Sequence, residues 1–427
     1  MPTFGWIMLM LLPYCIEYPL FDPVTRDLQG TIIAGIAALF CALDAASARV
    51  RDAMAGRGER TTPDRRVAVA LFATFAILAG LHLSKVSSIP LLDVLKSDLD
   101  PGSLLELRNG FSRYLEVSPV EKYLFNSAPF VLGAPAVIML IASGTLLPAV
   151  CAALLIGVYT VLSSAKVPLT LFGAMLLLGS VLRLAPRTRL LAMRLAMVGG
   201  VVLLTGLAIL SGSFQSDGLL SGIGEKLTRP QAAMHLGDYV RAREPHKEEA
   251  QLPLAHAADY LLYRVIFTPV EVSSRWYEYF NRYPAKEARI ERFITDSKSG
   301  ERMHPAQLIG IEQYHSRFPD KYPVETYAYA SFDADAYARW GLRGVIITLI
   351  LYAGMRLSIA AVDPEHSAAG GALYVPGIVL LSALPATASL QAIIAAHGFP
   401  LLIVLGLVIN WRTIGRVWRT RHSAMGC

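Results

Sequence analysis

The chain has 427 residues, of which 54% are hydrophobic and only 17% are charged, and its formal net charge is +6. A soluble globular protein rarely has this composition, whereas a protein that crosses a membrane many times typically does. Because much of the positive charge lies next to apolar segments, it indicates membrane topology, and we expect no nucleic-acid partner. The four cysteines lie in apolar runs or at the last residue, so they predict neither a disulfide framework nor a metal centre.

Apolar stretches recur along the chain, each close to the roughly 20 residues that a helix needs to cross the hydrocarbon core. We predict spanning helices at residues 4–20, 28–47, 66–84, 122–143, 145–163, 168–185, 192–211, 342–361, 371–392 and 396–411. The expected fold class is therefore an all-α polytopic membrane protein with about ten transmembrane helices. Membrane helices over 1–211 and 342–427 form two predicted domains, and the polar interval 212–341 predicts one large helical loop between them.

Clusters of lysine and arginine decide the direction in which the helices run. Residues 49–66, 183–194 and 411–422 are strongly basic, and all three lie on the inside if the N-terminus is cytoplasmic. The positive-inside rule then places the loop 212–341 on the outside, together with the segment 86–121 and the turn 163–168.

Two of these outer segments carry a cation near the predicted membrane surface. Apolar residues recur at helical spacing through 101–117, which predicts an amphipathic helix lying in the interface. Arg108 falls on the apolar face of this helix, where it either contacts lipid headgroups or binds an anion. A capping box formed by Ser118 and Glu121 begins the next spanning helix. Lys166, in the turn 163–168, is either an interface anchor or an anion ligand.

One arginine of the long loop stands alone in an apolar run. Arg264 lies in a predicted helix over 257–267, close to Tyr260 and Tyr263, and no charge follows it before Glu271. A guanidinium suits bidentate phosphate recognition, and it keeps its charge at any relevant pH. Since burying an unpaired charge is costly, we favour an anion-binding Arg264 over one that only extends its head group to water.

A second helix is predicted after Pro269, with Thr268 as its N-cap and Glu271 at its third position. Its charged residues share one face, because they are spaced by four, three and four residues: Glu271, Arg275, Glu278 and Arg282. We expect this face to be solvated and its arginines to pair with its glutamates. Arg275 is also a candidate substrate ligand.

Several acidic and histidine residues are candidates for acid–base or metal chemistry. His304, His315 and Glu325 could accept a proton, although their spacing singles out none of them. Asp98 and Asp100 form a D-x-D pair, which either binds a divalent cation or caps a turn. The sequence holds no P-loop, nucleophile-elbow or zinc-type motif, which argues against nucleotide hydrolysis, serine hydrolysis and zinc chemistry. We predict no cofactor and no metal ligand.

Together these features resemble the bacterial O-antigen polymerase family, the Wzy-type oligosaccharide repeat unit polymerases. The resemblance covers most of the chain and includes the multi-spanning layout with one dominant outer loop late in the sequence. It also rests on the turn Ser163-Ser164-Ala165-Lys166, the segment 263–269 and the run 327–344. That run ends in Gly341-Leu342-Arg343-Gly344, which is similar to the Gly-x-x-Gly re-entry into the membrane found in the family.

The resemblance implies a GT-C-like glycosyltransferase of the bacterial inner membrane with its active face toward the periplasm. Donor and acceptor would be polyprenyl diphosphate-linked oligosaccharides, in contact with membrane lipid, and the resemblance allows for a chain-length regulator protein as a partner. Arg264 and Lys166 would bind the diphosphate without a metal ion, with Arg108 as a third cation, although many relatives carry Arg where this chain has Lys166. The remaining nominees are Glu325 as general base and, as substrate ligands, Arg275, Tyr263, Tyr260 and His304. The aromatic run 276–280 suits either stacking on sugar rings or ordinary packing.

Three alternatives stay open at this point. A lipid-linked sugar ligase shares the layout and often relies on a loop histidine. A metal-dependent GT-C transferase would use Asp98 and Asp100. A polysaccharide or lipid transporter would need polar residues and broken helices at mid-membrane depth, where this sequence has few charges. Glu17 in the first segment is the clearest of them, and Asp44, Arg194 and Arg356 lie nearer the ends of their segments.

Overall fold

The computed structural model describes residues 2–54, 65–96, 107, 110–111, 117–163, 166–183, 266–286, 293–316, 327–362 and 368–411. These residues are helical except for loops and one short hairpin, in agreement with the predicted all-α class. The chain divides into two compact units. Unit 1 comprises 1–3, 38–205 and 347–427, and unit 2 comprises 4–37 and 206–346. The long loop therefore shares a unit with an N-terminal segment that the predicted domain boundaries had assigned elsewhere.

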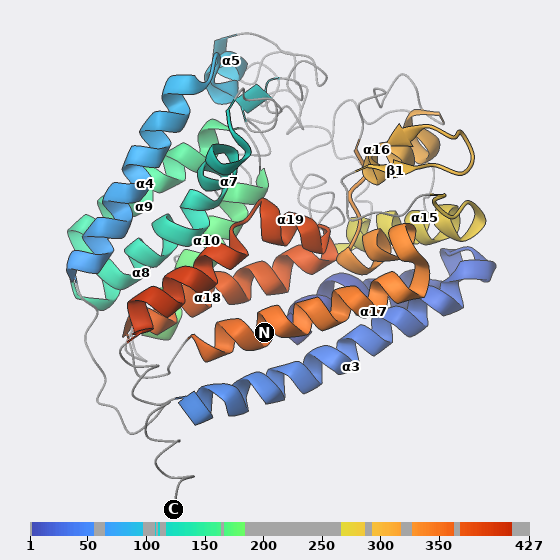
Figure 1. Ribbon diagram of the computed structural model, residues 1–427, viewed down its shortest axis with the longest axis horizontal. Helices are drawn as coiled ribbons and strands as arrows, with labels where there is room; N and C mark the ends of the chain where they lie inside the picture. The colour runs from blue at the N-terminus through green and yellow to red at the C-terminus, as the bar shows by residue number, and fades with distance from the viewer. Residues whose placement is uncertain are drawn as a thin grey trace, which may run out of the picture. The chain divides into compact units, whose positions relative to one another are not determined.

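A nearly continuous buried helix forms the centre of unit 1. It consists of α7 (Pro119–Ala128), the π-helical turn η3 (Pro129–Gly133) and α8 (Ala134–Ala142). Helices that contact α8 are α4 (Arg65–Lys85), α9 (Leu146–Leu162), α10 (Lys166–Arg183) and α18 (Ala368–Ala383). Figure 1 labels α4 and α9 close together, with α8 beside them. The other short elements of unit 1 are α5 (Pro90–Lys96), η5 (Leu384–Ala386) and α19 (Leu390–Ala395).

Glycines allow some helices of unit 1 to approach one another closely. A Cβ atom at Gly179 of α10 would lie 2.6 Å from the side chain of Ile138 in α8. A Cβ atom at Gly377 of α18 would lie 2.5 Å from the side chain of Ile359. Small residues at such contacts are typical of helices that pack inside a membrane, where close van der Waals contact replaces the hydrophobic effect between helices.

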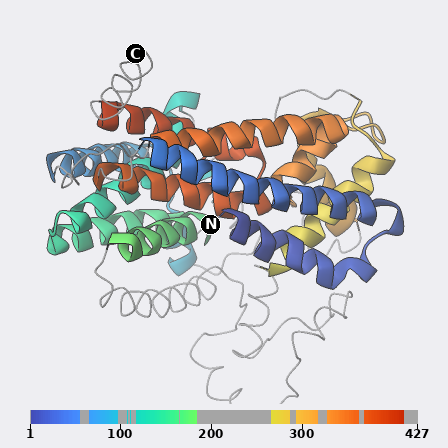
Figure 2. The same ribbon diagram turned by 90° about the horizontal axis from the view of Figure 1, so that it is seen from below.

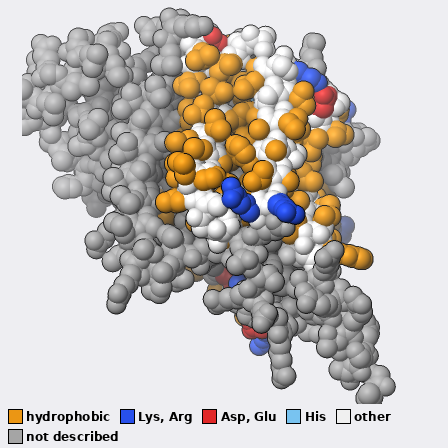
Figure 3. Space-filling view, turned by 90° about the vertical axis from the view of Figure 1, so that its left-hand side faces the viewer, with side chains coloured by type: hydrophobic (Ala, Val, Ile, Leu, Met, Phe, Trp, Pro, Cys, Tyr) orange, Lys and Arg blue, Asp and Glu red, His pale blue; other side chains and the backbone are white. Residues whose placement is uncertain are grey.

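An apolar surface covers the outward sides of α4 and α9 (Figure 3). Its large exposed side chains are Val69, Ile77, Leu81, Leu146, Leu147, Val150, Leu154, Leu155 and Val158. A face this rich in exposed aliphatic side chains suits contact with lipid tails and is unfavourable in water.

Among the described residues, four helices are long and apolar enough to cross a membrane: Pro23–Asp52, Arg65–Lys85, Pro119–Ala142 and Phe332–Ala361. Shorter apolar helices are Pro2–Glu17, Leu146–Leu162, Pro168–Gly179, Ala372–Ala386 and Phe399–Trp411. These helices indicate an all-α membrane protein. The number of about ten spans stays a prediction, and the expected helix at 192–211 lies outside the described residues.

The predicted capping box at the start of α7 is confirmed. The Ser118 hydroxyl accepts a hydrogen bond from the Glu121 backbone amide, and the Glu121 carboxylate accepts one from the Ser118 amide. Lys85 at the end of α4 pairs with the same Glu121 carboxylate and so links the two helix ends.

Unit 2 combines the N-terminal segment with the described part of the long loop. The N-terminal elements are α1 (Pro2–Trp6), the π-helical turn η1 (Ile7–Leu11), α2 (Leu12–Glu17), the 3-10 turn η2 (Tyr18–Leu20) and the first part of α3 (Pro23–Met54). The loop contributes α15 (Thr268–Arg282), the antiparallel strands β1 (Ile294–Thr295) and β2 (Arg302–Met303), α16 (Pro305–Gly310), the π-helical turn η4 (Ile311–His315) and the start of α17 (Phe332–Ala361). Trp6 ties the two parts together, because its indole donates to the Ile33 carbonyl and its ring packs edge-on against Phe332. Figure 2 shows α3 and α17 running alongside each other.

The predicted N-cap of α15 is wrong by one residue. Thr268 is the first helical residue, and Phe267 is the N-cap without any side-chain cap. The Phe267 carbonyl accepts from the amides of Val270 and Glu271, so the Glu271 amide that a Thr268 cap would hold already has its partner.

A break divides α17 near its start. Trp340 and Gly341 have non-helical backbone angles, and Gly341 lies at φ 61° and ψ −148°, a region that is essentially restricted to glycine. The break lies in the Gly-x-x-Gly run that, by the family resemblance, is expected to re-enter the membrane. Unit 2 includes α17 as far as Ile346, a few residues beyond the break, and the later residues of α17 belong to unit 1.

The hairpin of unit 2 is held by one buried carboxylate. Asp296 accepts hydrogen bonds from the Tyr279 hydroxyl at 2.9 Å and from the Ser299 amide at 2.7 Å and hydroxyl at 2.9 Å. Burial raises the pKa of Asp296, but the bonds from Ser299 and Tyr279 outweigh it and hold the pKa below its usual range. The charged form is therefore the one that the hairpin stabilises.

Asp296→Asn is expected to destabilise the hairpin by about 1.5–3 kcal/mol at pH 7, because it removes hydrogen bonds to a charged acceptor. A carboxyl group whose pKa is lowered in the folded state stabilises the fold at pH values above its unfolded-state pKa of about 4. That stabilisation is lost as the pH falls further, through the folded-state pKa. Hydrogen exchange of the 294–303 amides should therefore speed up in the variant at pH 7, and the difference should shrink toward pH 3. Glu301→Gln, an exposed change in the same hairpin, is the control; a pH-independent difference would contradict the charge argument.

Candidate functional site

Most of the predicted diphosphate site lies outside the described residues. This holds for Arg264, Arg108 and Glu325, for the substrate candidates Tyr260 and Tyr263, and for the alternative metal ligands Asp98 and Asp100. Lys166 is the first residue of α10, and only its backbone is described. Their predicted roles stay predictions, and the described candidates are Arg275 and His304.

The aromatic run on α15 packs in the core of unit 2. Trp276, Tyr277, Tyr279 and Phe280 are all at most 4% exposed. The Trp276 indole donates to the Ala328 carbonyl at 2.9 Å, and the Tyr277 hydroxyl donates to the Asp333 carboxylate at 2.7 Å. Of the two interpretations of this run, the structure supports ordinary packing, because rings buried on all sides have no face free for a sugar.

Only a narrow polar strip along α15 is accessible to solvent, because the rest of the helix surface is buried. Glu271, Arg275 and Glu278 are half-buried, Arg282 is exposed at the helix end, and the residues between Glu271 and Phe280 are otherwise buried. The predicted shared face is therefore confirmed, and so is one ion pair, since Arg275 Nη1 lies 3.5 Å from Glu278 Oε2. The face is less solvated than expected.

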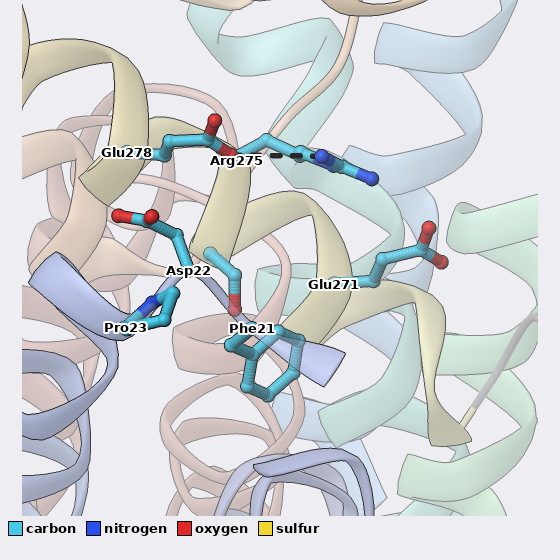
Figure 4. Close-up of a pocket in the computed structure, with 7 residues that line it drawn as sticks. Phe21, Asp22, Pro23, Glu271, Arg275 and Glu278 are labelled. Carbon is cyan, nitrogen blue, oxygen red and sulfur yellow. Dashed lines mark ion pairs between the residues drawn. The ribbon is translucent and has the colours of Figure 1, made fainter. Parts of the chain in front are cut away.

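This strip forms one wall of a pocket of about 250 Å³ within unit 2. The opposite wall is the turn that begins α3. The lining residues are Phe21, Asp22, Pro23, Glu271, Ser274, Arg275 and Glu278. Figure 4 shows the carboxylates of Asp22, Glu271 and Glu278 at different positions around the pocket, with Arg275 extended between Glu278 and Glu271.

Asp22 is placed by the start of α3. Its carbonyl accepts hydrogen bonds from the amides of Thr25 and Arg26, and its carboxylate accepts one from the Thr25 hydroxyl at 3.3 Å. Asp before Pro ahead of an apolar stretch is a typical helix N-terminus, so a local signal for this helix start was present in the sequence. That Asp22 would line the same pocket as Glu271, far away along the chain, could not be seen from local patterns.

Ser274 lines the pocket and is held by two hydrogen-bond contacts. Its hydroxyl lies 2.8 Å from Gln29 Oε1 and 2.9 Å from the Val270 carbonyl, either of which can accept its proton. Gln29 is fully buried in α3, and its Nε2 has no hydrogen-bond partner among the described residues. This hydrogen bond joins α15 to α3 at a residue that lines the pocket.

Beneath α15 lies a buried polar cluster at the start of α17. Besides the Tyr277–Asp333 bond, the Ser273 hydroxyl contacts that of Ser331 at 2.9 Å and accepts from the Ser331 amide. Asp335 and Arg339 form a bidentate pair, with N–O distances of 3.0 and 3.1 Å. These groups are almost completely buried, so we assign them to the support of α15 rather than to substrate contact.

His304 acts as the N-cap of α16. Its Nδ1 accepts a hydrogen bond from the Ala306 amide at 3.1 Å, which places the proton of the neutral ring on Nε2. Protonation of Nδ1 would break this cap, because a protonated nitrogen cannot accept the hydrogen bond from the Ala306 amide. The ring therefore has a structural task that competes with the predicted role as proton acceptor.

No protein-family model, curated protein or solved structure matches this chain. Within the described residues, no group of three or more histidine, cysteine, aspartate or glutamate side chains has a metal-binding arrangement. The site must therefore be judged on its own chemistry. That chemistry consists of three carboxylates, one guanidinium and one hydroxyl around a small cavity.

Proposed function

We propose that the chain is a membrane glycosyltransferase that polymerises polyprenyl diphosphate-linked oligosaccharides at the outer face of the bacterial inner membrane. The observation that carries the proposal is the pocket of unit 2. A unit built largely from the long loop presents carboxylates, a guanidinium and a hydroxyl, in a chain with four described helices that are long and apolar enough to span a membrane. Such a combination suits chemistry on a polar substrate that is anchored in lipid.

In the proposed reaction, the acceptor hydroxyl oxygen bonds to the anomeric carbon of the donor sugar. The bond from that carbon to the diphosphate breaks, and its electron pair leaves with the polyprenyl diphosphate. Arg264, Lys166 and Arg108 would stabilise the charge that builds on the leaving oxygens, which fixed cations at a low-dielectric boundary do best. The proton of the acceptor hydroxyl passes to a carboxylate, for which Glu325 is our nominee.

The polymerase is favoured over the ligase by one observation on His304. A ligase of this layout often relies on a loop histidine, and the Nδ1 of His304 is engaged in capping α16. His315, the other loop histidine that we considered, is described only in its backbone as the last residue of η4. The preference therefore concerns His304 alone.

Arg264→Ala is expected to abolish polymer when the gene is returned to a strain that makes the repeat unit but lacks its polymerase. Removing one fixed charge stabiliser typically costs about 10²–10³ in rate. Arg264→Lys should retain a small fraction, since an ammonium keeps the charge but loses the bidentate geometry. Polymer length on a gel, with membrane levels of each variant checked, is the measurement.

Arg282→Ala, which changes an exposed arginine at the end of α15, is the control and should give polymer of normal length. Normal polymer from both Arg264 variants would remove Arg264 from the mechanism. If Asp98→Asn or chelation with EDTA stopped the reaction while Arg264→Ala did not, the metal-dependent alternative would replace this proposal.

A further inference from the structure

The pocket of unit 2 has a charge that does not fit the diphosphate. It is lined by three carboxylates, Asp22, Glu271 and Glu278, and by one guanidinium, Arg275. Anions such as a diphosphate or a uronic acid would be repelled by this excess of negative charge. Carboxylates without an excess of cations are, in contrast, good acceptors for hydroxyl donors. The chemistry that the pocket recognises is therefore that of a neutral polyhydroxylated group.

The size of the pocket limits how large a neutral polyhydroxylated ligand it can hold. Its volume of about 250 Å³ lies just below the roughly 300–1,000 Å³ that is usual for pockets of drug-sized ligands. A single sugar ring fits such a space, whereas an oligosaccharide repeat unit or a polyprenyl chain does not. Phe21 closes one side of the pocket and is itself held by stacking on Tyr14, with ring centroids 5.3 Å apart.

The lining groups are also held in place before any ligand arrives. Asp22 is fixed by the start of α3, Arg275 by its pair with Glu278, and Ser274 by Gln29. Groups held in this way lose little conformational freedom when they bind, which favours recognition over a solvated cluster of mobile charges. The carboxylates of a solvated helix face alone would not share a pocket with an aspartate from a distant segment.

We propose that this pocket is the subsite for one neutral sugar residue, the one that carries the accepting hydroxyl. Asp22 and Glu271 accept hydrogen bonds from its hydroxyls, and Arg275 donates to its oxygens. The assignment of the sugar to the acceptor rests on the proposed function. In this assignment, the acceptor sugar binds in the carboxylate-rich pocket, and the donor diphosphate binds at the separate, cation-rich site that we propose for it.

Saturation-transfer NMR on the detergent-purified full chain tests the subsite without relying on activity. The probes are the methyl glycosides of glucose, galactose, mannose and N-acetylglucosamine, with glucuronate as the anionic comparison. At least one neutral glycoside should receive saturation from the wild-type chain, and glucuronate should receive less. Binding should weaken about tenfold in Glu271→Gln and in Arg275→Gln, because each removes hydrogen bonds to the ligand.

Arg282→Gln is the matched control, since it neutralises an arginine on the same helix beyond the pocket. It should bind like the wild type, and a thermal melt of each variant shows whether it is folded. Glu271→Gln, which keeps the size of the side chain, decides the question if Arg275→Gln fails to fold. Absence of transfer to every neutral glycoside, or equal transfer in the wild type and in both pocket variants, overturns the subsite.

Failure of the subsite and failure of the proposed function give different results. If polymer depends on Arg264 but glycosides bind equally in the pocket variants, the subsite is wrong and the polymerase stands. If glycosides bind through Glu271 and Arg275 but polymer does not depend on Arg264, the sugar site stands and the proposed mechanism is wrong. When both dependences hold, the Glu271→Gln variant should also make shorter polymer.

Discussion

Asp44→Ala is expected to destabilise the protein by about 3–5 kcal/mol, the usual cost of leaving the partner of a buried ion pair uncompensated. Arg356 Nη2 lies 2.9 Å from Asp44 Oδ1, and the Arg356 side chain is only 4% exposed. The other Asp44 oxygen accepts from the Thr3 hydroxyl at 2.7 Å, and Arg356 Nη1 donates to the Tyr374 hydroxyl at 3.2 Å. Removing the carboxylate leaves the guanidinium with one neutral partner in an apolar setting.

The pair joins three helices of unit 1, because Asp44 belongs to α3, Arg356 to α17 and Tyr374 to α18. One helical turn away, Phe40 stacks on Tyr352 with centroids 4.5 Å apart. The stacked rings and the ion pair hold the same two helices together, so loss of the pair leaves the helices in contact but with a charge that lacks its counterion.

The double variant Asp44→Ala/Arg356→Met distinguishes the stabilisation by the ion pair from the cost of burying Arg356 without its counterion. It should recover much of the stability that Asp44→Ala alone loses, since replacing both partners by apolar groups is often close to neutral. Thermal melting in detergent, followed by circular dichroism, measures both variants against the wild type. A double variant that is no more stable than Asp44→Ala would show that the pair does not act as a unit.

Local signals in the sequence predicted local structure well. The capping box of Ser118 and Glu121 and the shared face of α15 involve residues three or four apart, which a helix brings together whatever the rest of the chain does. The N-cap of α15 failed by one residue because the Phe267 carbonyl competes for the amide that Thr268 would have capped. Such competition depends on backbone geometry just before the helix, which residue types alone do not show.

Contacts between residues far apart in the chain could not be predicted from these local signals. The aromatic run of α15 had two interpretations, and only its surroundings show that Trp276 and Tyr277 face the core. The pocket also combines Asp22 with Glu271, which comes from a distant segment of the chain. Asp44 and Arg356 were noted as charges near the ends of apolar segments, but no pattern in the sequence pairs residues that lie so far apart.

Gly344→Ala is expected to destabilise unit 2 by about 3 kcal/mol, at the upper end of the usual cost of overpacking. A Cβ atom at this position would lie 2.3 Å from the Ala336 carbonyl oxygen and 3.0 Å from the Trp340 Cβ. The obstacle is the backbone of the turn before the break, so no side-chain rotation relieves it. Gly341→Ala should also be costly, at about 1–3 kcal/mol, because alanine is strained at φ 61°.

Gly354→Ala in the same helix is the matched control. Apart from its own helix backbone, no atom of the described residues lies within 4 Å of the Cβ that it would add. The higher helix propensity of alanine should leave the protein as stable or slightly more stable. Hydrogen exchange around 327–346 and thermal melts of the three variants measure the difference. If the tight backbone around the break holds α17 in unit 2, exchange should rise at 327–346 in Gly344→Ala and not in Gly354→Ala. Equal behaviour of the two would mean that the Gly-x-x-Gly run is not needed to form the break, and the likeness to a membrane re-entry would lose its physical basis.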